Sequence, residues 1–129
     1  DKGASAIVMA LEGADVYSVD IRDGWEYVKA KDNPDGKIHP IVGNSLNEDL
    51  FKAYPNMKLS ETNLWLIDGL HTEQQVMQEM NLYQKYFTPG SVVILDDVEQ
   101  LGNVWKNFSP DKFLSLDIHG KDGVGVVVI

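Results

Sequence analysis

Three acidic residues follow two apolar stretches of the sequence, and their type and spacing could bind a cation. Asp68 comes directly after "LWLI", residues 64–67, and Asp96 with Asp97 comes directly after "SVVIL", residues 91–95. If both stretches are parallel strands, these acids meet at one edge of the sheet, where they would repel one another without a cation. Carboxylate oxygens are the ligands that Mg²⁺, Mn²⁺ and Ca²⁺ prefer. We therefore predict a divalent metal site, the alternative being a helix cap at Asp96 or Asp97 and a loop acid at Asp68.

Other polar residues stand just past predicted strands. Asp20 ends "DVYSVD", where an acid could accept hydrogen bonds from both hydroxyls of a ribose, or could instead cap the following turn. Asn44 and Ser45 follow the next strand, where a short polar side chain could meet an adenine edge, or could form an ordinary turn before a helix cap. His71 lies three residues after Asp68 and could act as a general base, although a lone loop histidine is more often a cap or a surface residue.

The elements that must position these residues alternate along the chain. Apolar residues recur at helical spacing over 3–11 and 72–87, and continuous apolar runs over 63–68 and 91–95 are typical of strands buried on both faces. Asn47 is a predicted N-cap, Gly13 and Pro55 are predicted helix stops, and Pro40 suggests an edge strand. The full set comprises helices over 3–11, 23–32, 47–54 and 72–87, strands over 14–21, 37–45, 63–68 and 91–95, and a hairpin of 112–118 and 124–129.

This order predicts an α/β fold: a Rossmann-like, doubly wound, mostly parallel sheet with a C-terminal antiparallel β-hairpin. Ligands of such sheets bind beyond the carboxyl ends of the strands, where the polar residues above fall. Residues 1–129 are expected to form a single domain. The sequence begins already on a predicted helix, so we expect the first strand and its glycine-rich loop to lie upstream.

Composition narrows the partners. With 11 basic and 20 acidic residues the net charge is -9, which argues against nucleic acid and anionic membranes and favours a small molecule or a cation. The absence of cysteine excludes disulfides, thiolate metal sites and a cysteine nucleophile, and favours the cytoplasm. No apolar stretch approaches the roughly 20 residues of a membrane span, and no signal peptide is recognisable, so we predict a soluble protein.

Taken together, these motifs resemble the class I S-adenosylmethionine-dependent methyltransferases, in particular the metal-dependent O-methyltransferase branch with its macrocin-type, cephalosporin-hydroxylase-like and catechol-type members. "GASA", residues 3–6, resembles the end of the first family motif, and "VYSVDI", residues 16–21, resembles the second. "LWLIDGLHTEQQVMQEMNLYQKYFTPGSVVILDDV", residues 64–98, resembles a segment written as I-D-G-x-H, a helix, L-x-P-G-G, a strand and an acidic pair. Leu70 replaces an acid common in this motif, and Ser91 replaces the second glycine of P-G-G.

The resemblance implies transfer of a methyl group from S-adenosylmethionine to a hydroxyl of a small molecule, assisted by Mg²⁺ or another divalent cation. It implies a metal site at Asp68, Asp96 and Asp97, a base at His71, and a cosubstrate site at Gly3, Ser5, Asp20, Ile21, Asn44, Ser45 and Asp68. In this reading Asp20 holds the ribose, Asn44 and Ser45 lie near the adenine, and Gly3 and Ser5 lie beside the methionine moiety.

Two alternatives stay open. One is a cosubstrate-binding module of a larger protein that has kept the fold but not the chemistry, and the other is a hydrolytic metal site. The expected partner is a hydroxylated small molecule, with neither nucleic acid nor membrane. The apolar residues around Trp65 and over 124–129 would also allow a homo-oligomer.

Overall fold

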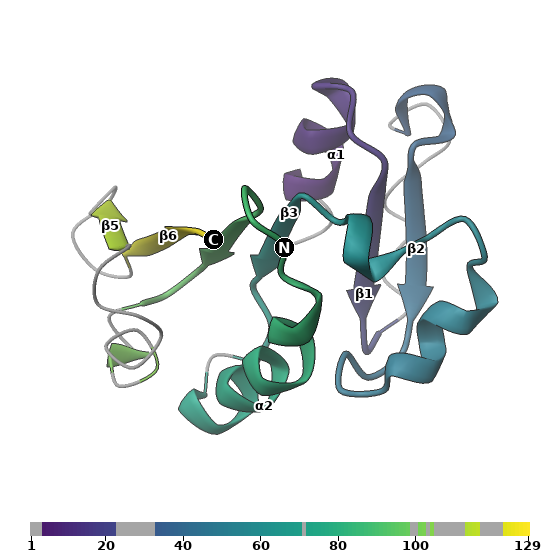
Figure 1. The fold of residues 1–129 in the computed structure, drawn as a ribbon. Helices are drawn as coiled ribbons and strands as arrows, with labels where there is room; N and C mark the ends of the chain where they lie inside the picture. Colours follow the sequence, from purple (N-terminus) through teal and green to yellow (C-terminus); the bar gives the residue numbers. More distant parts are fainter. Residues whose placement is uncertain are drawn as a thin grey trace. The chain divides into compact units, whose positions relative to one another are not determined.

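The computed structural model describes residues 4–22, 33–70, 72–98, 101–102, 104, 113–116 and 123–129 (Figure 1). The chain divides into two compact units, Asp1–Met57 and Lys58–Ile129, and each is described by itself. Both contain helices and parallel strands, and the second ends in antiparallel strands, so the predicted α/β class is confirmed. The predicted helix over 23–32 lies outside the described residues.

The first unit is built on two parallel strands. They pair in register from Val16 with Ile38 to Asp20 with Val42, so their carboxyl ends lie at the same edge. Pro40 lies in the second of these strands, which has no other strand partner among the described residues. The elements of this unit are helix α1 (Ala4–Leu11), strands β1 (Val16–Asp20) and β2 (Ile38–Val42), and the 3₁₀ helices η3 (Pro34–Gly36) and η4 (Glu48–Ala53).

Helix α1 packs on these strands through small side chains. Ala6 and Ala10 are buried together with Val16 and Ile38, and small residues let the helix lie close to the strands. The helix stops at Gly13, whose φ of 98° is in the left-handed region that glycine adopts without strain. The Gly13 N–H donates to the Ala10 carbonyl at 3.0 Å. The predicted helix and its stop are therefore confirmed.

The predicted helix over 47–54 forms as the 3₁₀ helix η4. Asn47 is its N-cap, as predicted, and its side-chain oxygen accepts a hydrogen bond from the Asp49 N–H at 3.1 Å. The Tyr54 N–H donates to the Phe51 carbonyl at 3.0 Å, and Pro55 follows. The segment between this cap and the proline is short, so few of the repeated bonds that stabilise an α-helix can form, which favours the tighter helix.

The second unit contains a four-stranded sheet in the order β3-β4-β6-β5. β3 and β4 are parallel, and β6 pairs antiparallel with both β4 and β5, which confirms the predicted C-terminal hairpin. None of the helices in the described parts of the chain is long and apolar enough to cross a membrane. The elements are η5 (Leu59–Glu61), β3 (Leu64–Ile67), α2 (Glu73–Tyr83), η6 (Gln84–Tyr86), β4 (Val92–Leu95), β5 (Phe113–Leu116) and β6 (Val124–Val128).

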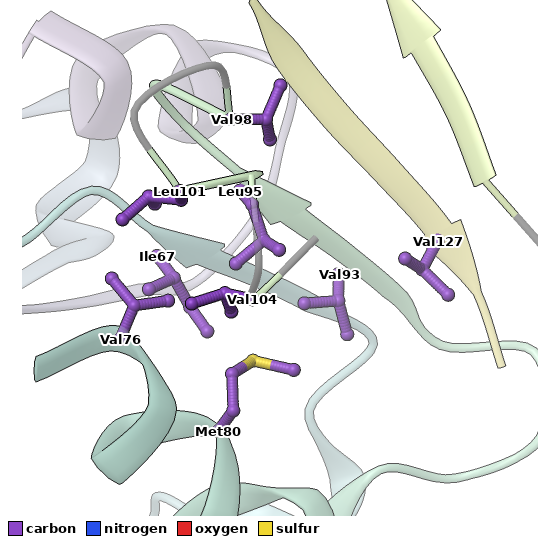
Figure 2. Packing of buried hydrophobic residues seen from close by; sticks show 9 residues of the cluster. All are labelled: Ile67, Val76, Met80, Val93, Leu95, Val98, Leu101, Val104 and Val127. Carbon is purple, nitrogen blue, oxygen red and sulfur yellow. The ribbon is translucent and has the colours of Figure 1, made fainter. Parts of the chain in front are cut away.

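The core of this unit lies between α2 and the sheet (Figure 2). Val76 and Met80 reach it from α2 at the predicted helical spacing, and Trp65 and Phe87 pack against it with ring centroids 5.2 Å apart. Each buried aliphatic side chain contributes roughly 1.5–3 kcal/mol to folding. The cluster consists of Ile67, Val76, Met80, Val93, Leu95, Val98, Leu101, Val104 and Val127.

Strand β3 differs from its prediction. Ile67 is 9% exposed, but Leu64 and Leu66, on the opposite face of the strand, are 39% and 37% exposed. Within this unit the strand is therefore not buried on both faces. The reason is that the core cluster with α2 covers only the face that carries Trp65 and Ile67.

Candidate functional site

The end of β1 presents Asp20 to solvent. The Asp20 Oδ1 accepts a hydrogen bond from the Arg22 N–H at 2.9 Å, so the side chain does close the turn that follows, as one of the two interpretations predicted. The Asp20 carbonyl accepts from the Gly43 N–H at 2.8 Å, which carries the pairing of β1 and β2 past the last strand residue. The local bond uses one carboxylate oxygen, and an exposed carboxylate fixed in this way can accept hydrogen bonds from a ligand.

The residues next to Asp20 and after β2 form the rest of this edge. Ile21 is 73% exposed, which places a large apolar side chain beside the acid. Asn44 forms a turn in which its Oδ1 accepts from the Leu46 N–H at 2.9 Å, so the simple turn interpretation of Asn44 holds. The amide nitrogen of Asn44 is a polar group that this loop can offer to a ligand. Ser45 follows it and takes part in an interaction of its own.

Of the two residues predicted to lie beside the methionine moiety, the structure describes only Ser5. Ser5 is exposed in the first turn of α1. Gly3 lies outside the described residues. Asp20, Asn44 and Ser45 therefore share one strand edge of the first unit, whereas Ser5 lies on the helix that precedes β1.

In the second unit, two of the three predicted metal ligands follow neighbouring parallel strands. Ile67 and Leu95 are register partners, and the Asp96 N–H donates to the Ile67 carbonyl at 3.1 Å. Asp68 and Asp96 each follow directly on their strand, at the same edge of the sheet. The prediction that these acids leave adjacent strand ends is confirmed.

Asp97 has an unusual backbone. Its φ is 54°, in the left-handed region where residues other than glycine are uncommon and asparagine and aspartate are the most tolerated. The Leu101 N–H donates to the Asp97 carbonyl at 3.2 Å. The strain of such a residue is of order 1–3 kcal/mol and often accompanies functional sites.

The predicted metal ligands do not form a closed set within the described residues. In that part of the chain, no group of three or more His, Cys, Asp or Glu side chains lies close enough to hold a metal ion. Asp68 and Asp97 each take part in a polar or electrostatic interaction in the structure. His71, the predicted base, lies outside the described residues.

Helix α2 starts directly after this edge and contains a residue that sequence reasoning missed. Thr72 caps the helix, since its Oγ1 accepts from the Gln75 N–H at 3.3 Å. Glu79 is buried at 5% exposure in the same helix. The signal was present in the sequence, because Glu79 lies on the apolar stripe of Val76 and Met80, where a charge is unexpected.

Among the described residues, a cavity and two ion pairs are formed by residues other than the predicted site residues. A cavity of about 310 Å³ lies beside β2, and none of the predicted cosubstrate residues lines it. Hydrogen bonds to Asp49 and Glu61 raise the pKa values of Lys52 and Lys58 above the ordinary lysine value, and all four side chains are exposed. The cavity is lined by Ile41, Val42, Asn47, Asp49, Leu50, Ala53 and Tyr54.

Comparison with solved structures supports the fold. The methyltransferase MycE of the mycinamycin biosynthetic pathway, solved with Mg, S-adenosylhomocysteine (SAH) and mycinamycin VI, is 14% identical with a TM-score of 0.57. The match covers 88% of this chain and 36% of MycE, so the chain spans little more than a third of that relative. A protein from Clostridium thermocellum described as a candidate rRNA methylase is 13% identical with a TM-score of 0.62, covering 99% and 84% of the two chains.

A third solved structure is also similar in fold. The PH0226 protein from Pyrococcus horikoshii OT3 is 14% identical with a TM-score of 0.60, over 98% of this chain and 77% of that one.

The sequence has no significant match among curated proteins. Residues 1–98, which include every residue of the predicted sites, match the family described as a methyltransferase domain. The chain therefore belongs to the methyltransferase-domain family, and its fold is similar to that of methyltransferases of known structure.

Proposed function

We propose that this domain catalyses transfer of a methyl group from S-adenosylmethionine to a hydroxyl of a small molecule, assisted by a divalent cation. Membership of the methyltransferase-domain family is the observation that carries the proposal, because the family match extends over all the strand-end residues. The comparisons do not favour a module without chemistry. Assistance by a cation is supported by MycE, whose structure contains Mg, and by the acids after β3 and β4.

The first unit supplies groups that suit the cosubstrate. Asp20 would accept hydrogen bonds from the ribose hydroxyls, since its turn bond holds the carboxylate in place at the strand end. Ile21 would cover one face of the adenine with its exposed side chain. Asn44 and Ser45 would contact the adenine edge, while Gly3 and Ser5 would lie beside the methionine part. These residues bind and orient, which is where most of the rate of a group transfer arises.

The acids of the second unit fit a hard cation. Their donors are all carboxylate oxygens, and Asp68 and Asp96 leave neighbouring strands in register. Mg²⁺ is usually held by one or two carboxylates together with waters and substrate oxygens, so a pair of acids with Asp97 nearby is a sufficient protein contribution. A cation bound there would supply positive charge that favours the ionised form of an acceptor hydroxyl. His71 is the proposed acceptor of the hydroxyl proton.

The partners follow from the same chemistry. We propose a hydroxylated small molecule as the acceptor and the cytoplasm as the compartment. Neither nucleic acid nor a membrane is part of the proposal, because the net charge is -9. A homo-oligomer through the apolar residues near Trp65 and 124–129 is compatible with it.

The proposal is tested by replacing Asp96, the acid that directly follows β4. Asp96→Asn keeps the shape of the side chain but removes its charge, and we expect Mg²⁺-stimulated methyl transfer to fall about 100-fold or more. The assay follows labelled methyl groups from S-adenosylmethionine into a panel of phenols, vicinal diols and sugars.

The matched control is Asp15→Asn. Asp15 is an exposed acid that precedes β1, at the opposite end of the strand from Asp20. We expect this variant to keep full activity. Equal Mg²⁺-stimulated activity in both variants would contradict the role of the strand-end acids, and no transfer to any acceptor by the unmodified protein would contradict the O-methyltransferase proposal.

A further inference from the structure

Glu79 is a charged residue in an apolar setting. It lies on α2 between Val76 and Met80, which are 2% and 3% exposed, and is itself only 5% exposed. Burial of a carboxylate costs several kcal/mol unless hydrogen bonds or charges compensate. Hydrophobic packing alone therefore does not explain why a glutamate occupies this position.

The contacts of Glu79 show where its carboxylate is held. The Gln75 Nε2 donates to the Glu79 Oε1 at 3.0 Å. On the other side, the two carboxylate oxygens lie 3.3 and 3.6 Å from the position that a Cβ of Gly69 would occupy. The carboxylate is thus held between the first turns of α2 and the backbone that follows β3.

Gly69 leaves space for the Glu79 carboxylate. It is not among the glycines with positive φ, which in the described residues are Gly13, Gly36, Gly90 and Gly123, so another residue could adopt its backbone conformation. A Cβ at this position would lie closer to the Glu79 oxygen than most real Cβ contacts, so the Glu79 side chain would have to shift by a few tenths of an ångström. Because residue 69 is glycine, the buried Glu79 carboxylate can lie close to the backbone that directly follows Asp68.

We propose that Glu79 is a positioning residue, whose buried carboxylate fixes the turn at Gly69 and thereby the direction of the Asp68 carboxylate. The link is short, because Gly69 is bonded to Asp68 and Gln75 is bonded through its N–H to the helix cap Thr72. The Glu79 side chain is buried on α2, and in this role it does not need to touch a ligand. The effect on ligand binding rests on the proposed function of Asp68, whereas the contact with Gly69 does not.

The test is a double-mutant cycle between positions 69 and 79. Gly69→Ala should weaken binding of Mn²⁺ and of SAH about tenfold, the size expected when a residue behind a ligand is disturbed. Glu79→Asp shortens the side chain by one methylene, so the double variant should recover part of that loss. Glu79→Gln, which removes the charge at the same size, should also weaken Mn²⁺ binding. Affinities come from calorimetry, and urea unfolding is measured for every variant.

Two controls separate positioning from general damage. Gly102→Ala makes the same change at a glycine of the second unit where a Cβ would meet nothing within 4 Å. Glu61→Gln removes an exposed acid of the same unit. Both should bind like the unmodified protein.

Each outcome decides the proposal. Recovery of Mn²⁺ or SAH affinity in the double variant, with a normal urea midpoint, supports it, because a merely structural role would not change affinity at constant stability. The proposal is overturned if Gly69→Ala has the same effect whether residue 79 is Glu or Asp. The effect is compared both in ligand affinity and in the unfolding equilibrium constant. If the unmodified protein binds neither probe, the proposed function fails, and coupling in the unfolding equilibrium alone then decides whether Glu79 holds the turn.

Discussion

At the scale of single residues, a structural role and a ligand role can coexist. The sequence left open whether Asp20 caps a turn or holds a ribose, and the structure shows the turn bond through Oδ1. Asn44 likewise closes a turn with its Oδ1. In both cases the local bond fixes the side chain and leaves part of it for a partner, so the turn bond is no argument against binding.

The same scale gives a prediction at Asp97, whose φ is 54°. Asp97→Gly removes left-handed strain of roughly 1–2 kcal/mol but adds backbone entropy of about 0.5–1 kcal/mol to the unfolded chain, so the free energy of unfolding should stay within about 1 kcal/mol of the original. Mg²⁺ at 100 times its Kd should stabilise the unmodified protein by about 2.7 kcal/mol and the variant much less. Thermal unfolding with and without Mg²⁺ measures both.

Asp97→Asn is the companion variant, because asparagine tolerates the same backbone and carries no charge. It should lose the Mg²⁺ effect in the same way. An undiminished rise in Tm with Mg²⁺ in either variant would show that Asp97 is not a ligand.

At the scale of elements, hydrophobic periodicity predicted most of the structure. Val76, Met80 and Tyr83 recur at helical spacing and are buried on α2, and the apolar run over 91–95 forms β4. The errors have physical causes. η4 is a 3₁₀ helix because its segment is short, and β3 is covered on one face only in its unit, which a continuous apolar run does not reveal.

The cap of α2 gives a prediction at this scale. Thr72→Ala removes the acceptor of the Gln75 N–H, and we expect the free energy of unfolding to fall by about 1 kcal/mol. Thr72→Ser keeps the hydroxyl and should retain most of the stability. Urea denaturation compares the two, and equal losses in both variants would show that the cap bond does not stabilise the helix.

At the scale of the whole molecule, the motifs predicted the family better than they predicted the site. The acids after β3 and β4 could be placed because parallel strands end at one edge. The contact between Glu79 and Gly69 could not be predicted, because it depends on how α2 packs and no local sequence pattern contains it. Metal binding also depends on side-chain directions, which strand order leaves open.

We propose that this chain binds S-adenosylmethionine at its strand ends, and titration calorimetry with SAH measures that binding. We expect saturable binding, with Mg²⁺ present or removed by a chelator, that weakens at least about tenfold in Asp20→Asn, since charge-assisted hydrogen bonds contribute about 1.5–3 kcal/mol. Asp20→Asn keeps an oxygen for the turn bond with Arg22, so its fold should remain. Absence of binding, or equal affinity in Asp20→Asn and the unmodified protein, would show that Asp20 does not hold the cosubstrate.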